Sequence, residues 1–134
     1  MAEASVRRAV GVPGPPPPTL RPALARPAAA FVTIHVDGRL NGCLGTVEAV
    51  EPLGRAVDRL ARDAALADPR LPPLRADQLT RTDLEVSVLS PGEPLPAGDR
   101  DELLAALRPG RDGLVLAAGG RRALFLPDVW QQLP

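Results

Sequence analysis

The sequence predicts an α+β fold: a mostly antiparallel sheet built from two hairpins plus a central strand, flanked by two short helices. Two apolar runs each turn back at a dipeptide that favours tight hairpins, Asp37-Gly38 and Gly119-Gly120. Two other segments repeat apolar residues at helical spacing. Strands and helices do not alternate regularly, which argues against a parallel sheet.

The first hairpin holds the only cysteine of the chain, Cys43. Residues 31–36 are rich in β-branched side chains and lead directly into the Asp37-Gly38 turn. A regular two-residue turn pairs residues 36 and 39 and therefore sets Val32 opposite Cys43. This register predicts that His35 lies on the other face of the strand. Cys43 then shares its face with Val32, Ile34 and Asn41.

The N-terminal segment, residues 1–28, is dense in proline and predicts an irregular arm. Because it offers almost no apolar periodicity for a core, we expect it to be dispensable for folding. Residues 29–134 are then the folded domain. A proline run can also bind an aromatic-lined groove, but a spacer is the simpler interpretation.

The remaining elements follow in chain order. Apolar residues recur every three or four positions over 52–67 and predict a helix that ends before Pro69. Residues 74–79 predict one helical turn, and residues 84–88 alternate as in a half-buried strand. Asp99 and Glu102 have the spacing of a capping box ahead of a second, short helix. The second hairpin should pair Leu116 with Ala123.

Charge and composition exclude several classes of function. Sixteen basic and sixteen acidic residues leave a formal net charge of zero, so no overall field draws the chain to nucleic acid or to an anionic membrane. No stretch is apolar enough to span a bilayer, and none resembles a signal peptide. One cysteine cannot form an internal disulfide, and with one histidine it cannot complete a zinc site. We therefore expect a cytoplasmic protein with neither metal nor cofactor.

Four blocks of sequence resemble the AMMECR-type domain family. They are FVTIHVDGRLNGCLGT, ADPRLPPL, LEVSVLS and DGLVLAAGGRRALFLPDVWQQLP, and they stand in family order from about residue 31 to residue 133. The family motif LRGCIG is matched by LNGCLG at residues 40–45, so Asn41 replaces an arginine. The motif DPRF is matched by DPRL, so Leu71 replaces a phenylalanine.

The resemblance implies an α+β fold and a chain shortened at both ends. In prokaryotes the family occurs as protein A of the AmmeMemoRadiSam system, beside a Memo-like protein and a radical SAM protein. The resemblance therefore implies these two proteins as partners. Val129, Trp130 and Leu133 begin an apolar segment that family members continue, so we also expect a homodimer.

Cys43 is the strongest candidate for a functional residue, because a thiol beside glycines can act as a nucleophile. The alternative is a small buried core residue. A cysteine nucleophile needs a base, and the predicted register turns His35, the only histidine, away from it. The family blocks and the turns next to them supply the candidate binding residues: Asn41, Gly42, Gly45, Arg70, Glu85, Arg121 and Arg122. The three arginines form one positive patch if the DPRL loop and the second hairpin meet.

Two functions remain open at this point. The first is an accessory or partner-binding module that acts with the Memo-like protein, the radical SAM protein or both through the Cys43 hairpin. The second is a cysteine-dependent enzyme or sulfur-handling protein with Cys43 as its nucleophile. We prefer the first, because the sequence shows no evident base, metal set or phosphate loop.

Overall fold

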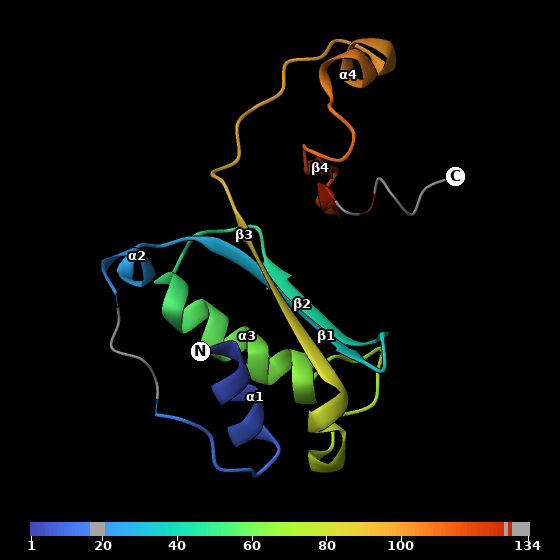
Figure 1. Cartoon of the computed structure of the whole chain (residues 1–134). Coiled ribbons are helices and arrows are strands. Elements are labelled where there is room, and N and C mark those ends of the chain that lie inside the picture. The colour runs from blue at the N-terminus through green and yellow to red at the C-terminus, as the bar shows by residue number, and fades with distance from the viewer. Residues whose placement is uncertain (17–20, 128, 130–134) are drawn as a thin grey trace. The chain divides into compact units, whose positions relative to one another are not determined.

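The chain folds into two compact units, residues 1–92 and 93–134. The structure is a computed structural model of the whole chain, and it describes residues 1–16, 21–127 and 129 (Figure 1). The first unit contains a three-stranded antiparallel sheet, and the second contains a two-stranded one. The predicted α+β class is confirmed.

The sheet of the first unit has the order β2-β1-β3. Its strands are β1 (Ala29–Val36), β2 (Arg39–Thr46) and β3 (Thr82–Leu89). Asp37 and Gly38 both have positive φ, 51° and 74°, as the predicted type I′ turn requires. One detail differs from the prediction: the lone strand, β3, lies at an edge, and β1 is the central strand.

Helix α3 (Leu53–Leu66) covers one face of this sheet (Figure 1). It matches the helix predicted over 52–67, with Pro52 as its N-cap. Because side chains alternate along a strand, β1 turns every second residue toward the helix. The buried core lies between the two elements and includes Val32, Ile34, Ala56, Leu60 and Ala61. We call this side of the sheet the inner face.

The N-terminal segment is not an irregular arm throughout, so that prediction is wrong for residues 2–9. They form helix α1 (Ala2–Ala9), which packs against α3. Val6 is 1% exposed and belongs to the core. Arg8 Nη2 forms an ion pair with Asp58 Oδ1 at 2.8 Å, which ties α1 to α3. The prolines begin only after the helix, at Pro13, and the short α2 (Pro22–Ala25) precedes β1.

Val6→Ala should therefore lower the free energy of unfolding by about 2 kcal/mol, because it removes buried apolar volume from the contact with α3. Chemical denaturation followed by circular dichroism measures the change. Val50→Ala is the matched control, since Val50 is 75% exposed and its substitution should be neutral. Equal stability of the two variants would show that α1 is not docked in solution.

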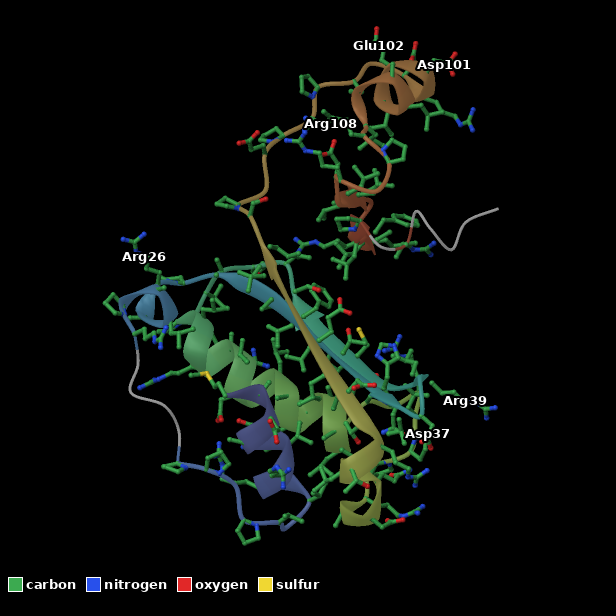
Figure 2. The ribbon with its side chains drawn as sticks, viewed as in Figure 1. Arg26, Asp37, Arg39, Asp101, Glu102 and Arg108 are labelled. Atoms are coloured by element: carbon green, nitrogen blue, oxygen red, sulfur yellow. The ribbon has the colours of Figure 1, made fainter. Side chains whose placement is uncertain are left out.

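The second unit contains one helix and one hairpin. Helix α4 (Arg100–Ala106) begins at the predicted cap, where the Glu102 N–H donates to Asp99 Oδ1 at 2.9 Å. Asp101 and Glu102 are the acidic residues of its first turn (Figure 2). Strands β4 (Leu114–Ala118) and β5 (Arg121–Phe125) pair Leu116 with Ala123, as predicted.

Two expectations concern the C-terminal apolar segment and the capacity of the chain to span a membrane. Trp130 and Leu133, which carry the expected self-association together with Val129, lie outside the described residues. In the part of the chain that the structure describes, no helix has the length and apolar character needed to cross a membrane.

Helix η1 (Ala76–Arg81), a 3-10 helix, provides the turn predicted before β3.

Candidate functional site

Cys43 lies on the outer face of the sheet, the face turned away from α3. It pairs with Thr33, whereas the predicted partner Val32 pairs with Leu44. The register shifts by one residue between Ile34 and His35 of β1, where β2 carries an extra residue, Asn41. The predicted hairpin register is therefore wrong beyond this bulge.

The bulge has a tertiary cause at each of its two residues. Asn41 is buried, and its Nδ2 donates to the carbonyl of Pro72 at 3.5 Å. Gly42 faces α3 so closely that an added Cβ would lie 2.0 Å from the carbonyl oxygen of Ala64. Both contacts hold this part of β2 against segments that follow it in the chain, and neither has a local signal in the sequence.

The thiol of Cys43 is free and partly exposed, so Cys43 is not a buried core residue. Its Sγ lies 3.4 Å from Thr33 Oγ1. Both backbone groups of Cys43 point away from β1, so Thr33 and Cys43 form a non-hydrogen-bonded pair, the kind that brings side chains close together. The thiol thus has a hydroxyl neighbour fixed by the sheet.

The backbone of Cys43 is held from the open edge of β2 by two residues of the DPRL loop. The Cys43 N–H donates to Asp68 Oδ2 at 2.9 Å, and Arg70 Nη2 donates to the Cys43 carbonyl at 2.8 Å. Arg70 also donates from Nε to Asp68 Oδ1 at 2.9 Å and from Nη2 to Asp68 Oδ2 at 2.7 Å. We call this arrangement the Asp68–Arg70 clamp.

The clamp contains a buried charge that is well satisfied. The Asp68 side chain is 1% exposed, whereas that of Arg70 is mostly exposed. The hydrogen bonds from Arg70 hold the pKa of Asp68 far below its usual value, and they outweigh the opposite effect of burial. Asp68 in turn raises the pKa of Arg70. The carboxylate therefore stays charged in the folded protein.

The outer face presents a row of side chains across all three strands. Glu85 of β3 pairs with Thr33 from the side opposite Cys43, so Cys43, Thr33 and Glu85 lie in register. Phe31 covers Gly45, where an added Cβ would lie 2.2 Å from its ring. We define the Cys43 surface as the outer-face residues around this row: Phe31, Thr33, His35, Cys43, Glu85 and Ser87.

The bulge puts Cys43 on the same face as His35, so the prediction that the two residues lie on opposite faces is wrong. His35 is two residues along β1 from Thr33 and therefore diagonal to Cys43, roughly 7 Å away by sheet geometry. Among the described residues, no hydrogen bond joins the imidazole to the thiol.

At the turn end of the hairpin, Asp37 and Arg39 are exposed (Figure 2).

The first unit gathers five of the predicted binding residues and Cys43. Gly45, Arg70 and Glu85 lie on or beside the Cys43 surface, whereas Asn41 and Gly42 hold the bulge from within. Arg121 and Arg122 begin β5 in the second unit, so a shared patch with Arg70 stays a prediction. Sequence reasoning missed Asp68 and Thr33. The signal for Asp68 was present, since an acid and an arginine flank Pro69 within a family block.

Fold and site together define a small α+β domain that presents one cysteine on a sheet face and clamps its backbone from a neighbouring loop. The AMMECR1 family model matches residues 1–133, and the chain belongs to this family. The match includes α1, which precedes the blocks that carry the resemblance in the sequence.

Relatives of the chain occur in archaea. A protein of Methanothermobacter thermautotrophicus is 43% identical over 99 residues, which cover 74% of this chain and 52% of that protein. A protein of Thermofilum pendens is 39% identical over 124 residues, 85% of this chain and 58% of that protein. The chain thus spans about half the length of the curated relatives it matches. The crystal structure of an uncharacterized protein from Pyrococcus horikoshii matches with a TM-score of 0.81 and 32% identity, over 96% of this chain and 68% of that one.

Proposed function

We propose that this chain is an accessory, partner-binding module of the AMMECR type that acts with a Memo-like protein, a radical SAM protein or both. The Cys43 surface is its contact face. The observation that carries the proposal is that Cys43 is partly exposed on the sheet while both of its backbone groups are fixed by the Asp68–Arg70 clamp. A surface held in place before binding loses little conformational entropy when a partner arrives.

The composition of the surface suits a partner that binds reversibly. Phe31 supplies an aromatic ring, and Thr33, His35, Glu85 and Ser87 supply polar groups around it. Protein interfaces combine aromatic anchors with a polar, solvated rim in this way. We propose the cytoplasm as the location, because a reducing compartment keeps a lone cysteine as a thiol.

The contacts of the thiol favour binding over catalysis by this chain alone. Within the described residues, Sγ lies 3.4 Å from Thr33 Oγ1, the side chain of Cys43 also interacts electrostatically with the Arg70 guanidinium, and no base contacts the thiol. The Arg70 guanidinium is directed to the Cys43 carbonyl and to Asp68. A base within hydrogen-bond reach of the thiol is the most direct means of forming the thiolate at neutral pH.

Partner binding should protect Cys43 from alkylation. With the Memo-like or radical SAM protein of the same genome at ten times its dissociation constant, labelling by a maleimide should slow about tenfold, because only the free fraction reacts. Intact mass spectrometry measures the rate, and every adduct reports Cys43 because the chain has one cysteine.

A relocated thiol gives the matched control. In the double variant Cys43→Ser with Arg55→Cys, the thiol lies at an exposed position of α3, away from the Cys43 surface. Its labelling rate should not change when the partner is added. The proposal would be contradicted if Cys43 stays unprotected with each of the two folded partners in excess. Equal protection of the thiols at positions 43 and 55 would also contradict it.

A cysteine-dependent enzyme or sulfur-handling protein is the second candidate, and the bulge is the observation that favours it. Because the bulge sets His35 and Cys43 on one face, a small rearrangement could bring the imidazole to Sγ as a base. This candidate would gain support if Cys43 in the free chain labels rapidly at pH 6 and if His35→Gln abolishes that rate without loss of stability. Partner protection would then be absent.

A further inference from the structure

We propose that β3 pairs with β3 of a second copy of this chain, antiparallel and centred on Val86. Three strands from each copy would then form one continuous sheet. The contact uses the edge of β3 and the inner face. On the outer face it reaches Glu85 and Ser87 of the Cys43 surface, which lie at the sheet edge opposite the strand of Cys43.

The two edges of the sheet differ in how they are covered. At the β2 edge, the Asp68–Arg70 clamp binds the outward N–H and C=O of Cys43. At the other edge, β3 pairs with β1 and with no further strand among the described residues. An uncovered edge strand presents a row of unpaired backbone groups that another strand can bind.

The register fixes which residues of β3 point outward. The Asp37 N–H donates to the Arg81 carbonyl at 2.9 Å, and these residues lie opposite each other just beyond the Val36–Thr82 pair. The odd-numbered residues of β3 therefore bond to β1, and the even-numbered ones turn their N–H and C=O to the free edge. The Asp68–Arg70 clamp supports this assignment. Because the N–H and C=O of Cys43 point away from β1, the paired residue Thr33 directs its own N–H and C=O toward β3. The Thr82 N–H already donates to Leu79, which leaves Leu84, Val86 and Val88.

The same three residues carry apolar side chains that lie on the inner face and are incompletely covered. Val86 is 39% exposed and Val88 is 54% exposed, although both pair with buried residues of β1. They line a groove of about 550 Å³ together with residues of α1 and α3, among them Ala2, Leu53 and Val57. Apolar surface beside an open strand edge is a site for protein contact.

The order of side chains in β3 favours a second copy as the occupant, because the strand is complementary to itself. When two antiparallel copies are centred on Val86, that residue faces itself and Leu84 faces Val88, so apolar side chains meet on the inner face. On the outer face Glu85 meets Ser87, a carboxylate with a hydroxyl. The hydroxyl already lies 3.4 Å from the Glu85 carboxylate of its own chain.

Neighbouring registers are less favourable. Centring on Glu85 sets this residue opposite itself, and centring on Leu84 sets Asp83 opposite Glu85. Like charges directly opposite each other on paired strands are destabilising. Centring on Ser87 shortens the paired segment, because β3 ends at Leu89. The register centred on Val86 therefore combines the longest pairing with no facing charges of one sign.

Val86→Lys should disrupt the dimer. It replaces the central apolar pair by two facing ammonium groups and should raise the dimer dissociation constant by about tenfold or more. Sedimentation velocity over a concentration series measures this constant. Val50→Lys makes the same change at a more exposed valine outside the strand and should leave the dimer intact. A wild-type chain that stays monomeric at the highest concentration, or a Val86→Lys variant that dimerises like wild type, would overturn the proposal.

Disulfide trapping tests the register and does not depend on the lysine variant folding. In the Cys43→Ser background, a Glu85→Cys chain mixed with a Ser87→Cys chain should form a cross-linked heterodimer on mild oxidation. Residues 85 and 87 face each other in a non-hydrogen-bonded pair, where the side chains approach closely enough for a disulfide. Each chain alone should cross-link much more slowly. Faster cross-linking of Glu85→Cys with itself would overturn the register centred on Val86.

Discussion

Gly42→Ala is expected to lower the free energy of unfolding by about 3 kcal/mol or more, since it forces a methyl group into closed packing. An added Cβ would lie 2.0 Å from the carbonyl oxygen of Ala64 and 2.9 Å from its carbonyl carbon. Both are backbone atoms of α3, so relief requires the end of the helix to move away from β2. Urea denaturation of the variant and the wild type measures the loss.

Gly92→Ala is the matched control for this substitution. Its added Cβ meets nothing within 4 Å, and its φ is not positive. The control should change the free energy of unfolding by less than about 0.5 kcal/mol. A Gly42→Ala variant as stable as the control would mean that α3 does not pack against β2 at Gly42.

Asp68→Ala should be the second large effect, a loss of about 2–3 kcal/mol, because it leaves the Cys43 N–H and the Arg70 side chain without their carboxylate acceptor. The effect should depend on pH. Since the folded pKa of Asp68 is lowered, its stabilisation is complete above the unfolded carboxyl value of about 4 and is lost as the pH falls below it. The stability difference between wild type and Asp68→Asn should therefore shrink from pH 5 to pH 2.

The exposed pair of Arg75 and Asp77 provides the comparison. Its Nη2 to Oδ2 distance, 2.7 Å, equals that of Arg70 and Asp68, but both of its side chains are exposed. Asp77→Ala should leave the denaturation curve unchanged, because exposed ion pairs contribute little. If Asp68→Ala and Asp77→Ala change the free energy of unfolding by the same amount, the clamp contributes no more to stability than an exposed ion pair.

Local signals were enough to predict much of the fold. The Asp37-Gly38 turn, the limits of α3 and the Asp99 cap depend on residues close together in sequence, and the structure confirms all three. Helix α1 has a weak local signal, because eight residues are marginal as an isolated helix, and its stability comes from packing Val6 against the core.

The candidate site was harder to predict for the same physical reason. The side on which Cys43 lies depends on one extra residue in β2, and that residue is held by Pro72, 31 positions along the chain. A shift of one residue exchanges the two faces of a strand, so the distant contacts of Asn41 and Gly42 put Cys43 next to Thr33, on the same face as His35. The pairing of Asp68 with Cys43 is likewise set by the path of α3 across the sheet.

The position of the clamp links the cysteine to the motions of one helix end. The last turn of α3 presses on Gly42 through Ala64, and two residues after the helix ends, Asp68 binds the backbone of Cys43. Fraying of that helix end therefore loosens the packing under β2 and releases the strand edge in a single event. Local openings of this kind occur far more often than global unfolding. The reactivity of the thiol thus depends on local opening at the C-terminal end of α3. A ligand that binds Cys43 also stabilises that end of the helix.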